Sequence, residues 1–175
     1  MRHLLPFVLA FIFAGHALAH GPTPKKVEES IEISAPPAKV WAIVKDFAGI
    51  AEWSPEVQES QGDGGDKAGG TRTLTLKSGG VIEDSLDEYS EDEMSYGYRL
   101  AKENVDAFPV SFYSASLAVK PEGDSASKVE WIGRFYRADT SNFPPEDKND
   151  EAAIAAMTNF FQAGLKGLKS KAEGK

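Results

Sequence analysis

The sequence predicts an α+β fold in which about seven mostly antiparallel strands are followed by one long C-terminal helix. Segment 71–137 alternates apolar and polar residues in runs that end at glycine-rich or acidic turns, which is typical of antiparallel hairpins. Segment 150–172 instead repeats apolar residues at helical spacing. Neither an internal repeat nor a linker interrupts residues 27–172, so we expect a single domain there.

The strand that opens the domain leads directly into two short helices. Residues 31–34 alternate Ile with Glu and Ser, which predicts a half-buried strand, and the prolines at 36–37 end it. The apolar residues of segment 40–47 recur at helical spacing, which predicts a short amphipathic helix. A second apolar turn at 50–53 is cut off by Pro55.

The rest of the sheet is predicted from alternation and from the turns between the runs. The six further strands are expected at 57–61, 71–77, 81–89, 94–100, 110–120 and 129–135. The glycine cluster at 62–70 lacks the lysine of a phosphate-binding loop and leads into a strand, so we expect it to be a flexible hairpin connection.

The C-terminal helix is predicted from its apolar stripe. That stripe consists of Ile154, Met157, Phe161, Leu165 and Leu168. Asp147 or Asp150 is the expected N-cap. Gly164 and Gly167 inside the helix each cost about 1 kcal/mol relative to alanine, so we expect close packing or room for a ligand to offset them.

The first 19 residues have the pattern of an export signal. Arg2 supplies the basic start, residues 4–14 the apolar centre, and residues 17–19 the small-residue cleavage motif. The apolar run is much shorter than the ~20 residues that a membrane-spanning helix needs. We therefore expect cleavage after Ala19, a flexible mature N-terminus at 20–26, a periplasmic protein and no membrane span.

Composition excludes several classes of function. The net charge of −8 disfavours nucleic acid and anionic lipid as partners and favours a basic protein. The chain has no cysteine, and its only histidines are His3, His16 and His20, of which the first two lie in the predicted signal. A Ser-His-Asp triad, a Cys-His pair and a His/Cys zinc site are therefore not expected, and we predict no metal and no cofactor.

The order of elements and several motifs resemble the SRPBCC superfamily, also described as START-like, Bet v 1-like or polyketide cyclase/dehydrase and lipid transport proteins. The resemblance is carried by residues 31–47, by Trp53-Ser54-Pro55 and by Val129-Glu130-Trp131, and it covers roughly 27–172. It implies a helix-grip fold, in which a curved antiparallel sheet wraps around the C-terminal helix and encloses an apolar cavity. Members include carriers, receptors and cyclases, so the fold alone does not decide function.

Within this superfamily the chain is similar to the MxaD-type accessory proteins of methanol oxidation. The matching segments are 20–24, 98–104, 134–137 and 142–145. The resemblance implies a periplasmic, non-catalytic protein that promotes the interaction of methanol dehydrogenase with its cytochrome. The alternative is a periplasmic binding or transport protein for a small hydrophobic ligand, such as a lipid or a polyketide-like molecule.

Residues that would line the family's cavity are apolar or aromatic and fall on one face of their elements. They are Trp53, Leu74, Leu76, Tyr98, Tyr113, Trp131, Phe135, Met157 and Phe161. We expect Trp53 to lie at the mouth of the cavity and the two tyrosine hydroxyls to supply polar contacts. The alternative is that these side chains simply fill the core.

Carboxylates are concentrated on the hairpin at 83–93. A calcium loop is not expected there, because the required order of ligands is absent. One interpretation is a solvated edge that resists aggregation. The other is a docking surface for a basic face of an electron-transfer partner. The candidate docking residues are Asp84, Asp87, Glu88, Glu91 and Asp92.

An enzymatic function is left open, although a non-catalytic one is favoured and no catalytic residue is assigned. Catalysis would have to use a carboxylate, with Glu83 or Glu103 as base beside Arg99 or Arg134. It would require burial that raises the pKa of that glutamate.

Overall fold

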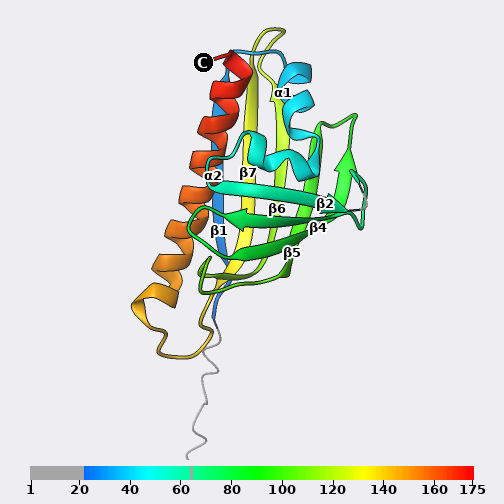
Figure 1. The fold of residues 1–175 in the computed structure, drawn as a ribbon. Helices are drawn as coiled ribbons and strands as arrows, with labels where there is room; N and C mark the ends of the chain where they lie inside the picture. Colours follow the sequence, from blue (N-terminus) through cyan, green and yellow to red (C-terminus); the bar gives the residue numbers. More distant parts are fainter. Residues whose placement is uncertain (1–21, 64) are drawn as a thin grey trace, which may run out of the picture.

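The computed structural model describes residues 22–63 and 65–175, and it consists of one seven-stranded antiparallel sheet with a long helix on its concave side (Figure 1). The strands are β1 (Lys25–Ile33), β2 (Val57–Asp63), β3 (Thr71–Leu76), β4 (Val81–Ser90), β5 (Ser95–Lys102), β6 (Val110–Pro121) and β7 (Ser127–Arg137). Their order in the sheet is β1-β7-β6-β5-β4-β3-β2, with β1 and β2 at the edges. The predicted fold class, number of strands and helix-grip arrangement are confirmed.

Three short helices and one long helix complete the domain. The helix α1 (Pro37–Val44) and the 3-10 helix η1 (Phe47–Glu52) follow β1, and the short 3-10 helix η2 (Glu146–Lys148) precedes α2 (Asp150–Glu173). Figure 1 shows the sheet bending so strongly that β2, β4 and β5 cross the direction of β1, β6 and β7. The helix α2 packs against β1 and β7, and the core lies between it and the concave face of the sheet.

Two details of the predicted C-terminal helix are wrong. The N-cap is Asn149, whose side-chain oxygen accepts a hydrogen bond from the Ala152 amide at 2.9 Å, because this residue has the extended backbone that a cap requires. Ile154 is 39 % exposed, and Ala153 takes its place in the buried stripe. A small residue fits there because the helix lies close to the sheet.

Both helix glycines pack closely against aromatic residues and leave no space for a ligand. A Cβ on Gly167 would lie 2.0 Å from the backbone oxygen of Trp53, and one on Gly164 would lie 2.8 Å from the ring of Trp131. Close packing is therefore the reason that α2 has glycine at both positions.

A bulge in β6 changes which side chains point inward. Ser111 pairs with Tyr136 and Ser114 with Arg134, so β6 has one extra residue over this interval. Phe112 absorbs it with a positive φ of 47° and is 71 % exposed. As a result the next side chain, Tyr113, points into the core, where it is only 5 % exposed.

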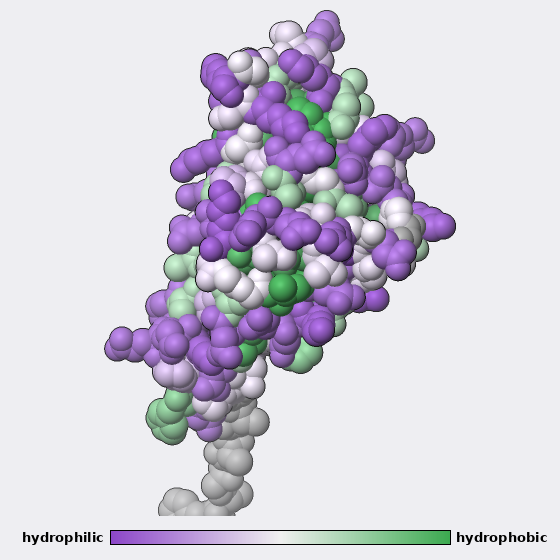
Figure 2. All heavy atoms as spheres, viewed as in Figure 1, coloured by the Kyte–Doolittle hydropathy of each residue, from purple (hydrophilic) through white to green (hydrophobic). Residues whose placement is uncertain are grey.

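The predicted export signal and cleavage site lie outside the described residues, as do His20 and Gly64. Within the described part of the chain, no helix is both long and apolar enough to cross a membrane. Figure 2 shows one face of the molecule as mostly hydrophilic, with small, separate apolar areas between the polar residues.

Candidate functional site

An ion pair lies at the centre of the concave face, inside the core. Arg72 on β3 and Asp84 on β4 are paired in register, and their side chains are 1 % and 0 % exposed. Arg72 donates from Nε to Oδ2 of Asp84 at 2.9 Å and from Nη1 to the Phe47 carbonyl at 3.0 Å, and its Nη2 lies 2.9 Å from the same Asp84 oxygen. Each of the three guanidinium nitrogens therefore has an oxygen partner.

Aromatic rings enclose this ion pair. The guanidinium carbon of Arg72 lies 4.1 Å from the ring centre of Phe47 and 4.6 Å from that of Tyr98, which are cation–π distances. Tyr113 donates its hydroxyl hydrogen to Oδ1 of Asp84. The Tyr98 hydroxyl accepts a hydrogen bond from Nε1 of Trp131 at 2.9 Å. We call Arg72, Asp84, Tyr98, Tyr113 and Trp131 the buried polar cluster.

Burial sets the pKa values in this cluster. It raises the pKa of the Asp84 carboxyl, an effect that the charge of Arg72 and the hydrogen bond from Tyr113 oppose. It lowers the pKa of Arg72, but the Asp84 charge and the nearby tyrosines more than offset this, so that the pKa is raised and the guanidinium stays charged. Burial also raises the pKa of Tyr113. The phenol therefore remains a hydrogen-bond donor at neutral pH.

All nine residues predicted to line a cavity are buried, at 5 % exposure or less. The structure brings most of them together: the rings of Trp131 and Phe161 stack at 4.4 Å, and those of Trp53 and Trp131 lie 5.6 Å apart. Trp53 is 4 % exposed and lies beneath α2, so its expected place at the mouth of a cavity is wrong. The use of these residues as a ligand site stays a prediction.

The interior has little free volume in this conformation. A cavity of about 10 Å³ lies beside the buried polar cluster, and its lining includes Asp84, Tyr98 and Tyr113. That volume is about what one water molecule needs. The aromatic side chains that were candidates for contacting a ligand here contact one another instead.

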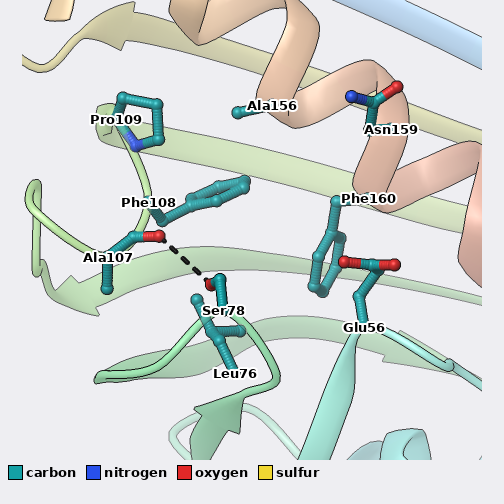
Figure 3. A pocket seen from close by; sticks show the side chains of 9 residues that line it. All are labelled: Glu56, Leu76, Ser78, Ala107, Phe108, Pro109, Ala156, Asn159 and Phe160. Carbon is teal, nitrogen blue, oxygen red and sulfur yellow. Dashed lines mark hydrogen bonds between the residues drawn. The ribbon is translucent and has the colours of Figure 1, made fainter. Parts of the chain in front are cut away.

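A second, larger space is a groove of about 190 Å³ at the surface, and Figure 3 shows the side chains that line it. It is lined by Glu56, Leu76, Ser78, Ala107, Phe108, Pro109, Ala156, Asn159 and Phe160. Phe108 and Phe160, each 9 % exposed and 5.7 Å apart, also line the internal cavity. These two rings therefore separate the surface groove from the buried polar cluster.

Four of the five predicted docking carboxylates are accessible on the β4–β5 hairpin. Glu88, Glu91 and Asp92 are exposed, and the half-buried Asp87 pairs with Arg99. Glu91 accepts hydrogen bonds from Tyr89 at 2.7 Å and from Lys45 at 3.2 Å. Asp84 is wrong as a docking residue, because its side chain is fully buried against Arg72.

The alternative catalytic pairs do not form a buried site. Glu83 is half-buried and Glu103 is exposed, while Arg99 is engaged by Asp87. The buried carboxylate is Asp84, and its partner Arg72 was missed by the sequence analysis. The signal was present in the strand alternation: Arg72 shares the phase of the core residues Leu74 and Leu76. A charged residue in an apolar phase needs a buried partner.

No group of three or more histidine, cysteine or acidic side chains that could hold a metal ion occurs among residues 22–63 and 65–175. The carboxylate oxygens of the buried Asp84 are engaged with Arg72 and Tyr113.

The fold and its enclosed polar cluster define a helix-grip α+β protein. The family model described as "Polyketide cyclase / dehydrase and lipid transport" matches residues 24–173, and the chain belongs to this family. The resemblance to the superfamily predicted from the motifs is thereby confirmed. A search of curated proteins finds no match.

Several solved structures have the same fold. Protein XoxI from Bacillus cereus is 27 % identical, with a TM-score of 0.70 over 83 % of this chain and 94 % of that chain. A protein from Nitrosospira multiformis is 25 % identical, with a TM-score of 0.68 over 84 % and 95 %. The ZhuI aromatase/cyclase from Streptomyces sp. R1128 is 15 % identical, with a TM-score of 0.70 over 86 % and 94 %. At that identity the last similarity indicates the fold alone.

Proposed function

We propose that this protein is an exported, non-catalytic accessory protein of methanol oxidation, which promotes the interaction of methanol dehydrogenase with its cytochrome in the periplasm. The observation that carries the non-catalytic part is the filled interior, in which a cavity of about 10 Å³ has no room for a substrate. The polar groups there are engaged with one another, since Asp84 accepts from both Arg72 and Tyr113. A function exerted through the surface then fits the molecule best.

The distribution of negative charge supports the β4–β5 hairpin as the surface that contacts a partner. The chain has a net charge of −8, and Glu88, Glu91 and Asp92 project from one hairpin. Complementary charge accelerates the encounter of proteins and loses its effect as salt screens it. The similarity of the sequence motifs to the MxaD-type proteins supplies the identity of the two partners.

Electron transfer from purified methanol dehydrogenase to its cytochrome tests this proposal. We expect the mature protein to raise the rate, and the increase to shrink as ionic strength rises. The triple variant Glu88→Gln/Glu91→Gln/Asp92→Asn should lose most of the increase. A matched control, Glu32→Gln/Asp124→Asn/Glu151→Gln, removes three exposed charges elsewhere and should keep it. No stimulation at any salt concentration would show the proposal to be wrong.

A second function, the binding of a small hydrophobic ligand, is supported by one specific observation. The rings of Phe108 and Phe160 line both the groove of about 190 Å³ and the internal cavity. Displacement of these rings would join the two spaces beside Tyr113 and Asp84. Native mass spectrometry after mild purification is the test: a bound ligand supports this function, and an empty protein that binds no added fatty acid or aromatic alcohol argues against it.

A further inference from the structure

The strand β1 is an edge of the sheet, and its outer side is only partly covered. Near the end of β1, Lys169 of α2 donates from Nζ to the Glu32 carbonyl at 2.6 Å. Backbone groups of alternate residues in an antiparallel strand point to opposite sides, so those of Glu28 and Ser30 point outward as well. They make no hydrogen bond to any residue that the structure describes, and Ser30 lines a cleft of about 260 Å³ between β1 and α2. The first half of β1 is therefore an open edge to which another strand can be added.

The adjoining part of α2 has an exposed apolar side chain beside this open edge. Asp150 pairs with Lys25 at 2.8 Å, and Gln162 donates to Glu29 at 3.2 Å, so α2 runs alongside β1 here (Figure 1). Ile154 follows Asp150 by one turn on the same face of the helix and lies between these two contacts. It is 39 % exposed. A second chain added to the open half of β1 would cover it.

The charges of the open half of β1 are arranged so that the segment is complementary to itself. Residues 25–29 read Lys-Lys-Val-Glu-Glu, so two positive charges precede Val27 and two negative charges follow it. When two copies pair antiparallel about a two-fold axis at Val27, Lys26 of each copy faces Glu28 of the other. Lys25 of each copy likewise faces Glu29 of the other. All four cross-strand charge pairs are then attractive, and the two Val27 side chains face each other on the concave side.

Other ways of pairing two sheet edges are less favourable. A slip of two residues brings Glu28 opposite Glu28 or Lys26 opposite Lys26, depending on its direction, and like charges directly opposite each other are destabilising. A slip of one residue moves the side chains to the other face of the sheet. The other edge strand, β2, is not complementary to itself, because its charged residues, Glu59 and Asp63, are both acidic. The charges therefore specify both the strand and the register.

We propose that β1 pairs with β1 of a second copy of this chain, antiparallel and centred on Val27, so that the two sheets become one continuous sheet in a homodimer. The outward backbone groups of Lys26 and Glu28 supply the hydrogen bonds between the copies. Ile154 lies level with Val27 and therefore close to the two-fold axis. The inference goes beyond the proposed accessory function and does not depend on it, because β7 and β6 separate β1 from the strands of the acidic hairpin.

Sedimentation equilibrium of the mature protein tests the inference. We expect the wild type to form a reversible dimer whose population rises with concentration. Lys26→Glu and Glu28→Lys should each weaken self-association by about tenfold or more, because each changes two attractive cross-strand pairs into repulsive ones. Both side chains are exposed in the single chain, so the circular dichroism spectrum of each variant should match that of the wild type.

A mixture of the two variants is the most discriminating measurement. When a Lys26→Glu chain pairs with a Glu28→Lys chain, both cross-strand pairs again join opposite charges, so the mixture should dimerise about as tightly as the wild type. Each variant also loses the ion pair between Lys26 and Glu28 within its own chain. Mixing does not restore that pair, so a recovery of dimerisation can come only from contact between the copies.

Two matched charge reversals serve as controls. Lys39→Glu reverses an exposed cation on α1, and Glu59→Lys reverses an exposed anion on the other edge strand, β2. Both should dimerise like the wild type. A wild type that stays monomeric at every concentration overturns the inference, and so do β1 variants that dimerise normally or a mixture that dimerises no better than either variant alone. A dimer that only Glu59→Lys abolishes would assign the interface to β2, which overturns it too. The accessory function is judged separately, by the electron-transfer measurement.

Discussion

At the scale of single residues, the buried pair of Arg72 and Asp84 is the feature on which the interior depends most. A charge buried without a partner is far more costly than one at the surface, because it loses its hydration. The attraction between the two charges offsets this cost only while both residues are present. The hydrogen bond from Tyr113 satisfies the remaining carboxylate oxygen.

Replacement of Asp84 by asparagine should therefore destabilise the protein strongly. The change keeps the shape of the side chain but leaves the Arg72 charge uncompensated, so we expect a loss of about 3–5 kcal/mol in the free energy of unfolding. Urea denaturation measures it. The matched control is Asp87→Asn, which breaks the more exposed pair between Asp87 on β4 and Arg99 on β5 and should cost less than about 1 kcal/mol. Equal effects of the two variants would contradict this prediction.

The position of this pair shows what residue patterns can and cannot reveal. Arg72 falls in the phase of Leu74 and Leu76, and Asp84 in the phase of Ile82 and Leu86. Each charge could be recognised as lying in an apolar phase. That the two are opposite each other depends on the register between β3 and β4, which alternation alone does not determine.

At the scale of elements, α2 is held by close backbone packing in its second half. Alanine favours helices by about 1 kcal/mol over glycine, so Gly167→Ala should stabilise an isolated helix. In the protein its Cβ would meet the Trp53 backbone oxygen, and overpacking typically costs about 1–3 kcal/mol. We expect a net loss of stability and a lower thermal midpoint. The exposed control Ala155→Gly should lose only about 1 kcal/mol; a stabilised Gly167→Ala variant would disprove the close approach.

Near its C-terminal end, α2 is connected to Ser34, the residue that follows β1, by a hydrogen bond that depends on pH. Glu173 accepts hydrogen bonds from Lys175 and, at 2.9 Å, from the Ser34 amide, and these lower its pKa from 4.5 to about 2. Because the folded state has the lower pKa, this interaction stabilises the protein above the unfolded value and is lost as pH falls from about 4.5 toward 2. Thermal midpoints measured across that range should fall less steeply for Glu173→Gln than for the wild type. Parallel curves would contradict the assignment.

Elements with a clear periodicity of apolar residues were predicted correctly, but the helix cap was not. Alternation identified all seven strands, and the apolar stripe identified α2. The N-cap at Asn149 and the exposure of Ile154 depend on where the helix starts relative to η2 and how closely it approaches the sheet. Neither feature can be predicted from the periodicity of apolar residues in the sequence.

At the scale of the whole molecule, a single core runs from Trp41 at α1 to Phe108 at the groove. Phe108 lies on the connection between β5 and β6 and packs on Phe160 and Tyr113. The ring covers the buried polar cluster from the side of the groove. Removal of the Phe108 ring should therefore affect both the stability of the protein and the access of small molecules to its interior.

Phe108→Ala should lower the free energy of unfolding by about 3 kcal/mol and open the interior to small apolar molecules. Binding of 8-anilinonaphthalene-1-sulfonate under native conditions is the measurement, and we expect fluorescence well above that of the wild type. Phe143→Ala removes an exposed ring and should change neither quantity. A variant with unaltered dye binding would show that Phe108 does not close the interior.

The sequence by itself determined the fold class, the order of elements and the family, because these follow from periodicity and from local motifs. It also indicated that a histidine- or cysteine-based catalytic centre is not to be expected in the domain. Only the tertiary structure decided that the interior is filled, that Asp84 is buried against Arg72, and that a bulge in β6 leaves Phe112 exposed and turns Tyr113 inward. Those three facts depend on strand register and on the distance between helix and sheet, which are set by the packing of residues far apart in the chain.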